Sequence, residues 1–249
     1  MAVTASPDQQ QALLDLQGLD TKLLQLAHKR AGLPEIAAAQ DLEVELGSIK
    51  MRLVAAQTEA SDLKLNQLKA EADVEQVVSR AKRDQDRLDS GAVSAAKELE
   101  SLQHEIGTLA KRQAELEDIE LEIMQAYENA QQAVTELQAS EIETTEKLST
   151  LAQTRDDLFA DIDFEVNSLT SQRTEIANGL PADLIALYDK IRADQGGVGA
   201  ALIHRGSCQG CHITIDAQEI DQIRNMSADA IARCDQCRRI LVRTAESGL

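Results

Sequence analysis

The stretches CQGC at residues 208–211 and CDQC at residues 234–237 contain all four cysteines of the 249-residue chain. Two C-x-x-C pairs at this separation are typical of a tetrahedral zinc site, because each turn directs two sulfurs toward one point. His204 and His212 lie nearby, but four cysteines already complete the shell. A closed shell leaves no position for water, so the pattern predicts one structural Zn²⁺ with the ligands Cys208, Cys211, Cys234 and Cys237.

The residues alone leave other uses of these cysteines open. A reactive thiol pair would make this a redox or metal-handling protein, but the βαβ context of a thioredoxin-like motif is not visible. Cys208 to His212 also fits the CxxCH pattern of c-type haem attachment, which would leave the second pair without a role. Haem attachment and disulfides both require export. Because residues 1–10 lack the charged and apolar parts of an export signal, we expect a cytoplasmic protein.

Composition indicates long helices rather than a large globular core. Only 2% of the residues are aromatic and none is tryptophan, although aromatic side chains supply much of a typical core. The net charge of −18 comes from residues 1–200, since arginines and acidic residues balance in 201–249. An acidic surface repels nucleic acid and anionic lipid, so any phosphate contact must come from the C-terminal part. No apolar run is long enough to predict a membrane span.

Apolar residues recur with coiled-coil spacing along most of residues 12–178. Gly32-Leu33-Pro34 interrupts the pattern, which predicts a kink before a second helix that ends near Leu88. Asp89-Ser90-Gly91 is a turn signal. The predicted seam of the second helix consists of Leu42, Leu46, Ile49, Leu53, Ala56, Ala60, Leu63, Ala70, Val74, Val77, Ala81 and Leu88.

A third helix of about 84 residues is expected to end near Asn178, before Gly179. Its predicted seam contains a short step from Leu116 to Ile119, which indicates local overwinding. Since the first two helices together have a similar length, we expect an antiparallel coiled-coil hairpin with its turn near residues 89–92. The alternative is a parallel dimer through one continuous helix, which Gly91 and Pro34 disfavour.

The C-terminal part predicts a small β domain. A short helix over residues 181–195 is followed by the glycines of 196–199, which we interpret as a hinge-like linker. Apolar alternation predicts strands at 200–203, 211–215 and 240–242, with a helical turn at 220–226. The expected fold class is therefore mostly α with a small zinc ribbon, and the expected domains are a coiled-coil hairpin over 1–178, helix and linker over 179–199, and a C4 zinc ribbon over 200–249.

The chain resembles a bacterial family of coiled-coil hairpin proteins with a C-terminal C4-type zinc ribbon. The resemblance rests on residues 97–106, 116–118, 188–199 and the ending CRRIL at 237–241. The family usually has CGRIL there, so Arg238 replaces a glycine and the backbone after the second Cys pair is expected to differ. Some relatives bind an alternative sigma factor or a flagellin messenger RNA, and others act with type III secretion components. The resemblance thus implies a protein or nucleic-acid partner.

We interpret the protein as a non-enzymatic adaptor, a monomer or homodimer, whose coiled coil presents the ribbon to a protein partner. The sequence contains no phosphate loop, nucleophile elbow or zinc-protease motif. The alternative is a nucleic-acid-binding regulator that contacts RNA or DNA, but residues 201–249 lack aromatic side chains for base stacking. The candidate partner or phosphate contacts, which could equally be ordinary solubilising charge, are Arg205, Arg233, Arg238, Arg239 and Arg243.

Overall fold

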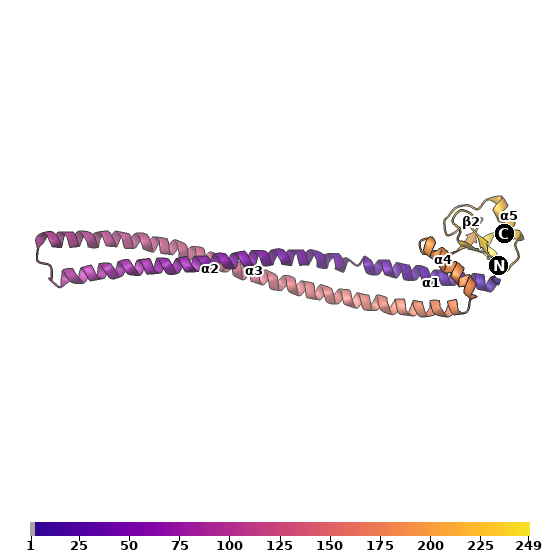
Figure 1. Ribbon diagram of the computed structural model, residues 1–249, viewed down its shortest axis with the longest axis horizontal. Coiled ribbons are helices and arrows are strands. Elements are labelled where there is room, and N and C mark those ends of the chain that lie inside the picture. The colour runs from indigo at the N-terminus through magenta and orange to yellow at the C-terminus, as the bar shows by residue number, and fades with distance from the viewer. Residues whose placement is uncertain (1–2) are drawn as a thin grey trace. The chain divides into compact units, whose positions relative to one another are not determined.

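The computed structural model describes residues 3–249 and has the element order shown in Figure 1. Most of the chain is helical and the only sheet in the described part lies near the C-terminus, which confirms the predicted fold class. No helix within residues 3–249 is long and apolar enough to cross a membrane. The helices are α1 (Pro7–Ala31), α2 (Pro34–Asp89), α3 (Ala96–Asn178), α4 (Ala182–Asp194) and α5 (Ala217–Asn225); the strands are β1 (Ala200–His204), β2 (Ser207–Cys208), β3 (Ala232–Arg233) and β4 (Ile240–Val242), followed by the short helix η1 (Ala245–Ser247).

The chain divides into two compact units. One unit contains Ala37–Ala152, which is most of α2 and the first part of α3. The other combines Met1–Ile36 with Gln153–Leu249, and so brings both ends of the chain together. The domain boundaries expected from the sequence stay a prediction, since the two units divide within the long helices.

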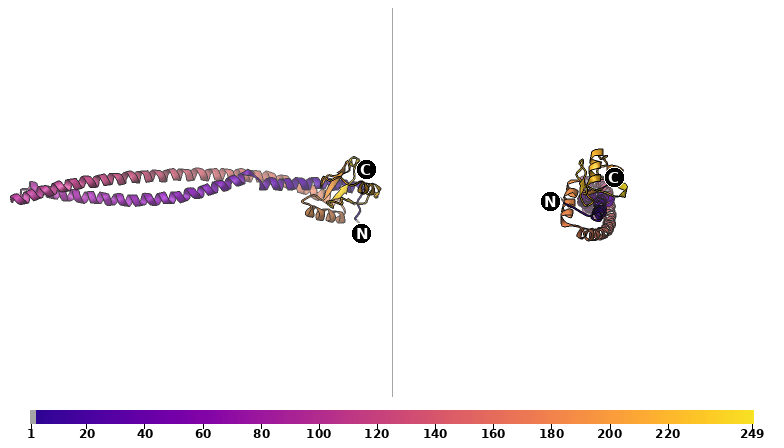
Figure 2. Two further views of the ribbon diagram at one scale, coloured as in Figure 1. Left: turned by 90° about the horizontal axis from the view of Figure 1, so that it is seen from above. Right: turned by 90° about the vertical axis from the view of Figure 1, so that its right-hand side faces the viewer.

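In the unit Ala37–Ala152, α2 and α3 lie side by side in opposite directions and are joined by a turn (Figures 1 and 2). Gly91 adopts φ +70° in that turn, a conformation that glycine tolerates best. Exposed ion pairs such as Arg87–Glu98 (2.8 Å) connect the helices, but each contributes at most about 1 kcal/mol. The pair is therefore held mainly by its seam, and every predicted α2 seam residue is buried or half-buried.

The seam of α3 differs from the sequence prediction at one step. Leu116 is buried, but Ile119 remains 45% exposed, and the next seam positions are the half-buried Glu120 and Ile123. The regular alternation of four and three residues continues, so the predicted overwinding is wrong. The physical reason is that a glutamate can lay its aliphatic stem along a seam while its carboxylate reaches water.

In the second unit, α1 packs along the last part of α3. Leu19, Leu26 and Leu33 form an apolar cluster with Ile162 and Leu169. The helix break at Gly32–Leu33, between α1 and α2, confirms the predicted kink. The cluster therefore holds α1 against the last part of α3.

Arg30 occupies a seam position that the apolar pattern of α1 skips. Its guanidinium lies 4.1 Å from the centre of the Phe159 ring and forms an ion pair with Asp163. A cation over an aromatic face is attracted by the electron-rich ring. Arg30 therefore replaces an apolar seam residue without leaving its charge unpaired.

The four strands form one sheet in the order β2-β1-β4-β3. Strand β1 pairs with β4 in parallel, whereas β2 and β3 are antiparallel to their neighbours. The strands predicted at 200–203 and 240–242 are present as β1 and β4. The strand predicted at 211–215 is not formed, and only Thr214 makes an isolated bridge, to Ser207. That segment instead forms the turn after Cys211.

Successive residues of β4 face two different cores, as expected for a strand. Ile240 and Val242 pack with Leu13 of α1 and Tyr188 of α4. Leu241 packs on the other side with residues of the cysteine turns. The sheet therefore lies between the helices α1 and α4 on one side and the cysteine turns on the other, and it packs against both.

The N-terminal segment also belongs to this sheet region. The Ala5 amide donates to the Asp229 carbonyl at 2.8 Å, and Thr4 bridges Ala230. The Gln10 side chain donates to the Ala228 carbonyl at 2.9 Å. Residues before α1 therefore help to close the ribbon, which the sequence did not reveal.

Candidate metal centre and its support

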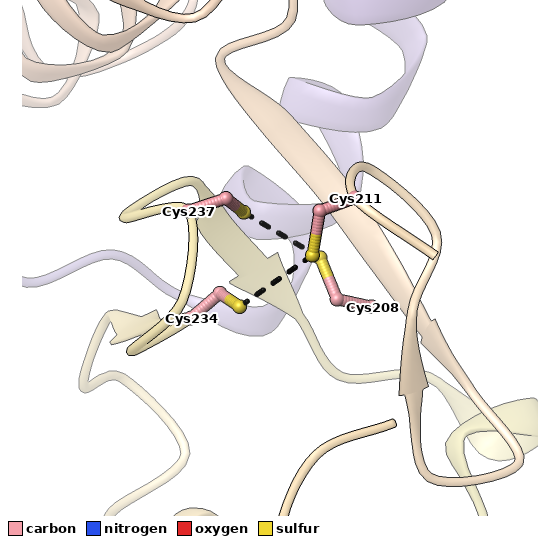
Figure 3. A group of neighbouring side chains, drawn as sticks. All are labelled: Cys208, Cys211, Cys234 and Cys237. Atoms are coloured by element: carbon pink, nitrogen blue, oxygen red, sulfur yellow. Dashed lines mark hydrogen bonds between the residues drawn. The ribbon is translucent and has the colours of Figure 1, made fainter. Parts of the chain in front are cut away.

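The four cysteines converge on one point (Figure 3). All four Sγ atoms lie within 4.8 Å of one another, and none forms a disulfide. The Sγ atoms of Cys208 and Cys237 are 3.9 Å apart, and those of Cys211 and Cys234 are 4.0 Å apart. A tetrahedral site with Zn–S bonds of about 2.3 Å has S–S edges of about 3.8 Å. The cluster therefore fits one tetrahedral zinc ion.

The two C-x-x-C turns have the same local structure. The amide of His212 donates to the Cys208 carbonyl at 2.7 Å, and the amide of Arg238 donates to the Cys234 carbonyl at 2.8 Å. The amides of Cys208 and Cys234 each donate to the carbonyl five residues later. Because the two turns have the same hydrogen bonds, each presents its two sulfurs in the same way. Two short segments together therefore supply the four sulfurs of the shell.

Both turns end in a left-handed residue that is not glycine. His212 has φ 60° and Arg238 has φ 63°. The expectation that the backbone differs from that of relatives with glycine at this position stays a prediction; in this chain Arg238 itself adopts a backbone conformation that glycine takes without strain. A left-handed conformation costs an ordinary residue roughly 1–2 kcal/mol. The turn geometry that places the sulfurs outweighs this cost.

Burial and hydrogen bonding act on the cysteines in opposite directions. Burial raises the pKa of the Cys208 thiol to about 12 despite amide hydrogen bonds that favour its thiolate. Burial likewise raises the pKa of Cys234. Burial opposes ionisation of Cys237 as well, but hydrogen bonds with Arg239, Cys211 and Cys234 together outweigh it, and the net pKa of Cys237 is lowered. A metal would have to displace protons from the buried thiols, and its charge would then compensate the thiolates.

Two of the predicted contact arginines are engaged within the protein. Arg239 donates to the carbonyls of Gln195 (2.8 Å) and Val198 (3.1 Å). Arg243 donates to five backbone carbonyls at 2.8–3.2 Å, those of Ile223, Met226, Ser227, Ala228 and Ala230. These bonds tie α4 and the loop after α5 to the ribbon. Both guanidinium groups thus have structural partners in this fold.

The other three arginines are more accessible. Arg233 is half-buried and donates to the Arg238 carbonyl at 3.0 Å. Arg205 and Arg238 are exposed, and Arg205 also has a positive φ of 46°. Two of the five predicted contact residues are therefore exposed on left-handed turns.

The glycine segment 196–199 is tied down, which contradicts its interpretation as a hinge. The Gly199 amide donates to the Gln17 side-chain oxygen at 2.7 Å, and the Gln17 amide group donates to the Gly197 carbonyl at 3.0 Å. A Cβ at Gly199 would lie 2.7 Å from the Tyr188 carbonyl oxygen. Glycine is required there for close packing rather than for flexibility.

A buried polar network holds the same segment to the helices. Asp20, on α1, has a side chain that is only 1% exposed. It accepts from Arg173 at 2.7 Å and from Tyr188 at 2.8 Å, and it pairs with Arg192 at 2.9 Å. We call Gln17, Asp20, Arg173, Tyr188 and Arg192 the stem network. It connects α1, α3 and α4 next to the first strand of the ribbon.

Electrostatics within the stem network favour its charged and hydrogen-bonded form. Burial, and then the hydrogen bond to Asp20, raise the pKa of Tyr188, so its hydroxyl stays a donor. The hydrogen bond to Asp20 likewise raises the pKa of Arg173. The two arginines compensate the buried carboxylate, which would be costly alone.

The sequence contains a signal for this network that lies outside the apolar pattern. Gln10, Leu13, Gln17 and Asp20 follow a spacing of three and four residues and are all buried. They form a second stripe on α1, beside the one that contacts α3. Polar residues repeated in a helical stripe are thus a sign of a second contact surface.

Replacing Gly199 with alanine should destabilise the ribbon region by about 1–3 kcal/mol, because the added methyl overlaps a backbone carbonyl that cannot move aside. Gly107→Ala is the matched control, since that glycine is exposed within α3 and has open space around it; it should stabilise by up to about 1 kcal/mol. Hydrogen exchange at β1 and α4 amides measures the effect of Gly199→Ala, and exchange at the α3 amides around residue 107 measures that of the control. Equal behaviour of the two variants would contradict the close packing at Gly199.

The fold and site define a class of protein: an antiparallel coiled-coil hairpin with a four-cysteine zinc ribbon. Residues 16–196 match the CT398-like coiled coil hairpin domain, and residues 207–241 match the C4-type zinc ribbon domain. The chain therefore belongs to the CT398-like coiled-coil hairpin family, as the sequence resemblance predicted. Its zinc ribbon has four close cysteines that can bind one zinc ion. Neither matching description is that of a catalytic domain.

Relatives match over almost the whole chain. "Uncharacterized protein Rv2229c" of Mycobacterium tuberculosis is 35% identical over 94% of this chain and 95% of its own length. "Uncharacterized protein ML1638" of Mycobacterium leprae is 32% identical over 82% of this chain and 88% of its own. A solved structure from Mycobacterium smegmatis covers 97% of this chain and 100% of its own, with 31% identity and a TM-score of 0.83. CT398 from Chlamydia trachomatis has the same fold, with 21% identity over 94% of this chain and 97% of its own and a TM-score of 0.67.

Proposed function

We propose that the protein is a non-enzymatic scaffold whose C-terminal ribbon is completed by one structural zinc ion held by Cys208, Cys211, Cys234 and Cys237. The observation that carries this proposal is the closed set of four sulfurs, which would leave no position for a substrate or water on the metal. The long seams of α2 and α3 are used for packing. In this proposal the coiled coil presents the zinc ribbon to a protein partner.

The exposed turns next to the cysteines are the proposed contact surface. His212 and Arg238 each follow a cysteine directly, so their side chains border the metal centre. Ile213 is 49% exposed beside them. Strained non-glycine positions concentrate at functional sites, and here two of them carry a guanidinium and an imidazole. This chemistry suits a protein segment with acidic and apolar side chains, whereas RNA binding would lack aromatic rings for stacking.

Arg238→Gly should separate binding from stability. Glycine relieves the left-handed strain, so the ribbon should keep its zinc and gain about 1 kcal/mol of stability, while partner binding weakens. Arg224→Ala is the matched control, because Arg224 is an exposed arginine of the same region that pairs with Asp221. Zinc content, thermal unfolding and affinity purification from the producing cells measure these effects.

We expect a partner protein that co-purifies with the wild type and with Arg224→Ala but not with Arg238→Gly. A set of bound proteins that is identical for all three chains would contradict the proposed surface. Material whose recovery depends on intact nucleic acid would instead support the nucleic-acid alternative.

A further inference from the structure

Helix α2 has a second apolar stripe that faces away from α3. We call Val44, Met51, Val54, Leu65 and Leu68 the outer stripe. Their side chains are between 49% and 76% exposed. Their spacings of seven, three, eleven and three residues keep one heptad register. They therefore lie along one face of the helix rather than being scattered.

The outer stripe lies opposite the seam of α2. The seam positions Ile49 and Leu53 are buried against α3, and Met51, two residues from each of them, is rotated by about 200° around the helix. Between the outer apolar residues, the small side chains Thr58 and Ser61 are exposed. A helix with only one packing partner needs one apolar stripe. The second stripe indicates a second helical neighbour.

We propose that the outer stripe binds the outer stripe of a second copy of this chain, with the two α2 helices antiparallel. The sequence is self-complementary for one such register, centred between Glu59 and Ala60. In that register Met51 lies opposite Leu68 of the second copy, and Val54 lies opposite Leu65, each twice by symmetry. Thr58 and Ser61 meet at the axis, where small residues permit close approach.

Neighbouring registers do not match in this way. A shift by one heptad in one direction places Met51 opposite Ser61, and a shift in the other direction places it opposite Glu75. Both shifts also remove the pairing of Val54 with Leu65. The pattern of apolar residues thus favours one antiparallel register, as hydrophobic matching does in coiled coils.

Charges flanking the outer stripe favour the antiparallel orientation. In the centred register Lys50 faces Glu71 of the second copy, and the symmetry repeats this attractive pair. In a parallel, in-register pair, Lys64 would instead face Lys69 of the second copy, also twice. Like charges across a helix pair are repulsive. The flanking residues therefore select against the parallel alternative.

The size of the outer stripe indicates a weak dimer. Fully burying an aliphatic side chain of this size removes roughly 60–120 Å² of apolar surface from water. In the centred register Val44 lies opposite Glu75 of the second copy, so four residues on each copy meet apolar partners. They give on the order of 500–1,000 Å², which is below the range of about 1,200–2,000 Å² for stable interfaces. Flanking side chains add to this area. We therefore expect dimerisation that depends on concentration.

Sedimentation equilibrium of the full chain tests the proposal. The apparent mass should rise from 27.1 kDa toward twice that value between low-micromolar and near-millimolar concentration. Leu65→Lys should weaken dimerisation at least tenfold without changing the helical circular dichroism signal. Ile142→Lys is the matched control, since Ile142 is equally exposed on α3 and outside the outer stripe; it should dimerise like wild type. A monomer at all concentrations, or equal dimerisation of all three chains, would overturn the proposal.

Disulfide trapping tests the register. Zinc-loaded chains carrying Val54→Cys are mixed with chains carrying Leu65→Cys and oxidised mildly, with the unmodified chain as the control for the native cysteines. The antiparallel register predicts mainly mixed 54–65 disulfides. Predominant 54–54 and 65–65 disulfides would mean a parallel pair, and no disulfides above the control would mean that the two stripes do not meet; either result rejects the proposal.

Discussion

Removing zinc, or replacing Cys234 with serine, is expected to unfold the ribbon while α2 and the facing part of α3 stay helical. Zinc supplies on the order of 10–16 kcal/mol to four-sulfur and related small domains, which exceeds what a sheet this small can provide. The α2 seam packs against α3 and does not include the cysteines. Far-UV circular dichroism should therefore fall only slightly.

The loss should extend beyond the cysteine turns, because the sheet has two cores. Ile240 and Val242 pack on α1 and α4, so hydrogen exchange should accelerate in α4 and in the N-terminal segment that pairs with Ala230. Gln236→Ser is the matched control, since Gln236 is exposed within the same turn and should leave zinc binding unchanged. Melting of α2 and the facing part of α3 together with zinc loss would refute the division of the fold into a self-sufficient coil and a metal-dependent ribbon.

Asp20→Ala is expected to be the most destabilising change outside the cysteines. It removes the carboxylate that Arg173, Tyr188 and Arg192 share, and it leaves the two arginines with only the more exposed Asp189 as a counter-charge. Breaking a buried pair in this way costs about 3–5 kcal/mol. The free energy of opening, measured by native-state hydrogen exchange at α4 amides, should fall by that amount.

Asp163→Ala provides the control for Asp20. Asp163 also pairs with an arginine, Arg30, but both side chains are substantially exposed. An exposed pair contributes about 0–1 kcal/mol, so α4 exchange should hardly change. If the two alanine variants destabilise equally, burial does not determine the strength of the stem network.

The sequence predicted those features that depend on local repetition. Heptad spacing placed the whole α2 seam, the break before Pro34 was readable from a proline, and two C-x-x-C pairs indicated the metal cluster. The prediction placed Ile119 in the seam because its side chain is apolar. Glu120 occupies that seam position instead, with its aliphatic stem packed there. Periodicity identifies which face of a helix is buried, but amphipathic side chains can take a place in it.

Contacts between distant segments were not predictable from local pattern. Nothing near Ala5 shows that its amide bonds to Asp229. The glycines of 196–199 suggested a hinge, but Gly199 is a glycine because Tyr188 packs against it. Arg243, a candidate partner or phosphate contact by sequence, donates to the carbonyls of Met226 and Ser227 in the loop after α5. In each case the deciding partner is many residues away in the sequence.

X-ray absorption at the zinc edge, on the purified protein with its metal content quantified, tests whether the four cysteines hold a zinc ion. We expect one zinc per chain with four sulfur neighbours at about 2.3 Å, and loss of that signal in Cys234→Ser. A protein without stoichiometric zinc, or a zinc shell containing oxygen or nitrogen in place of sulfur, would contradict it.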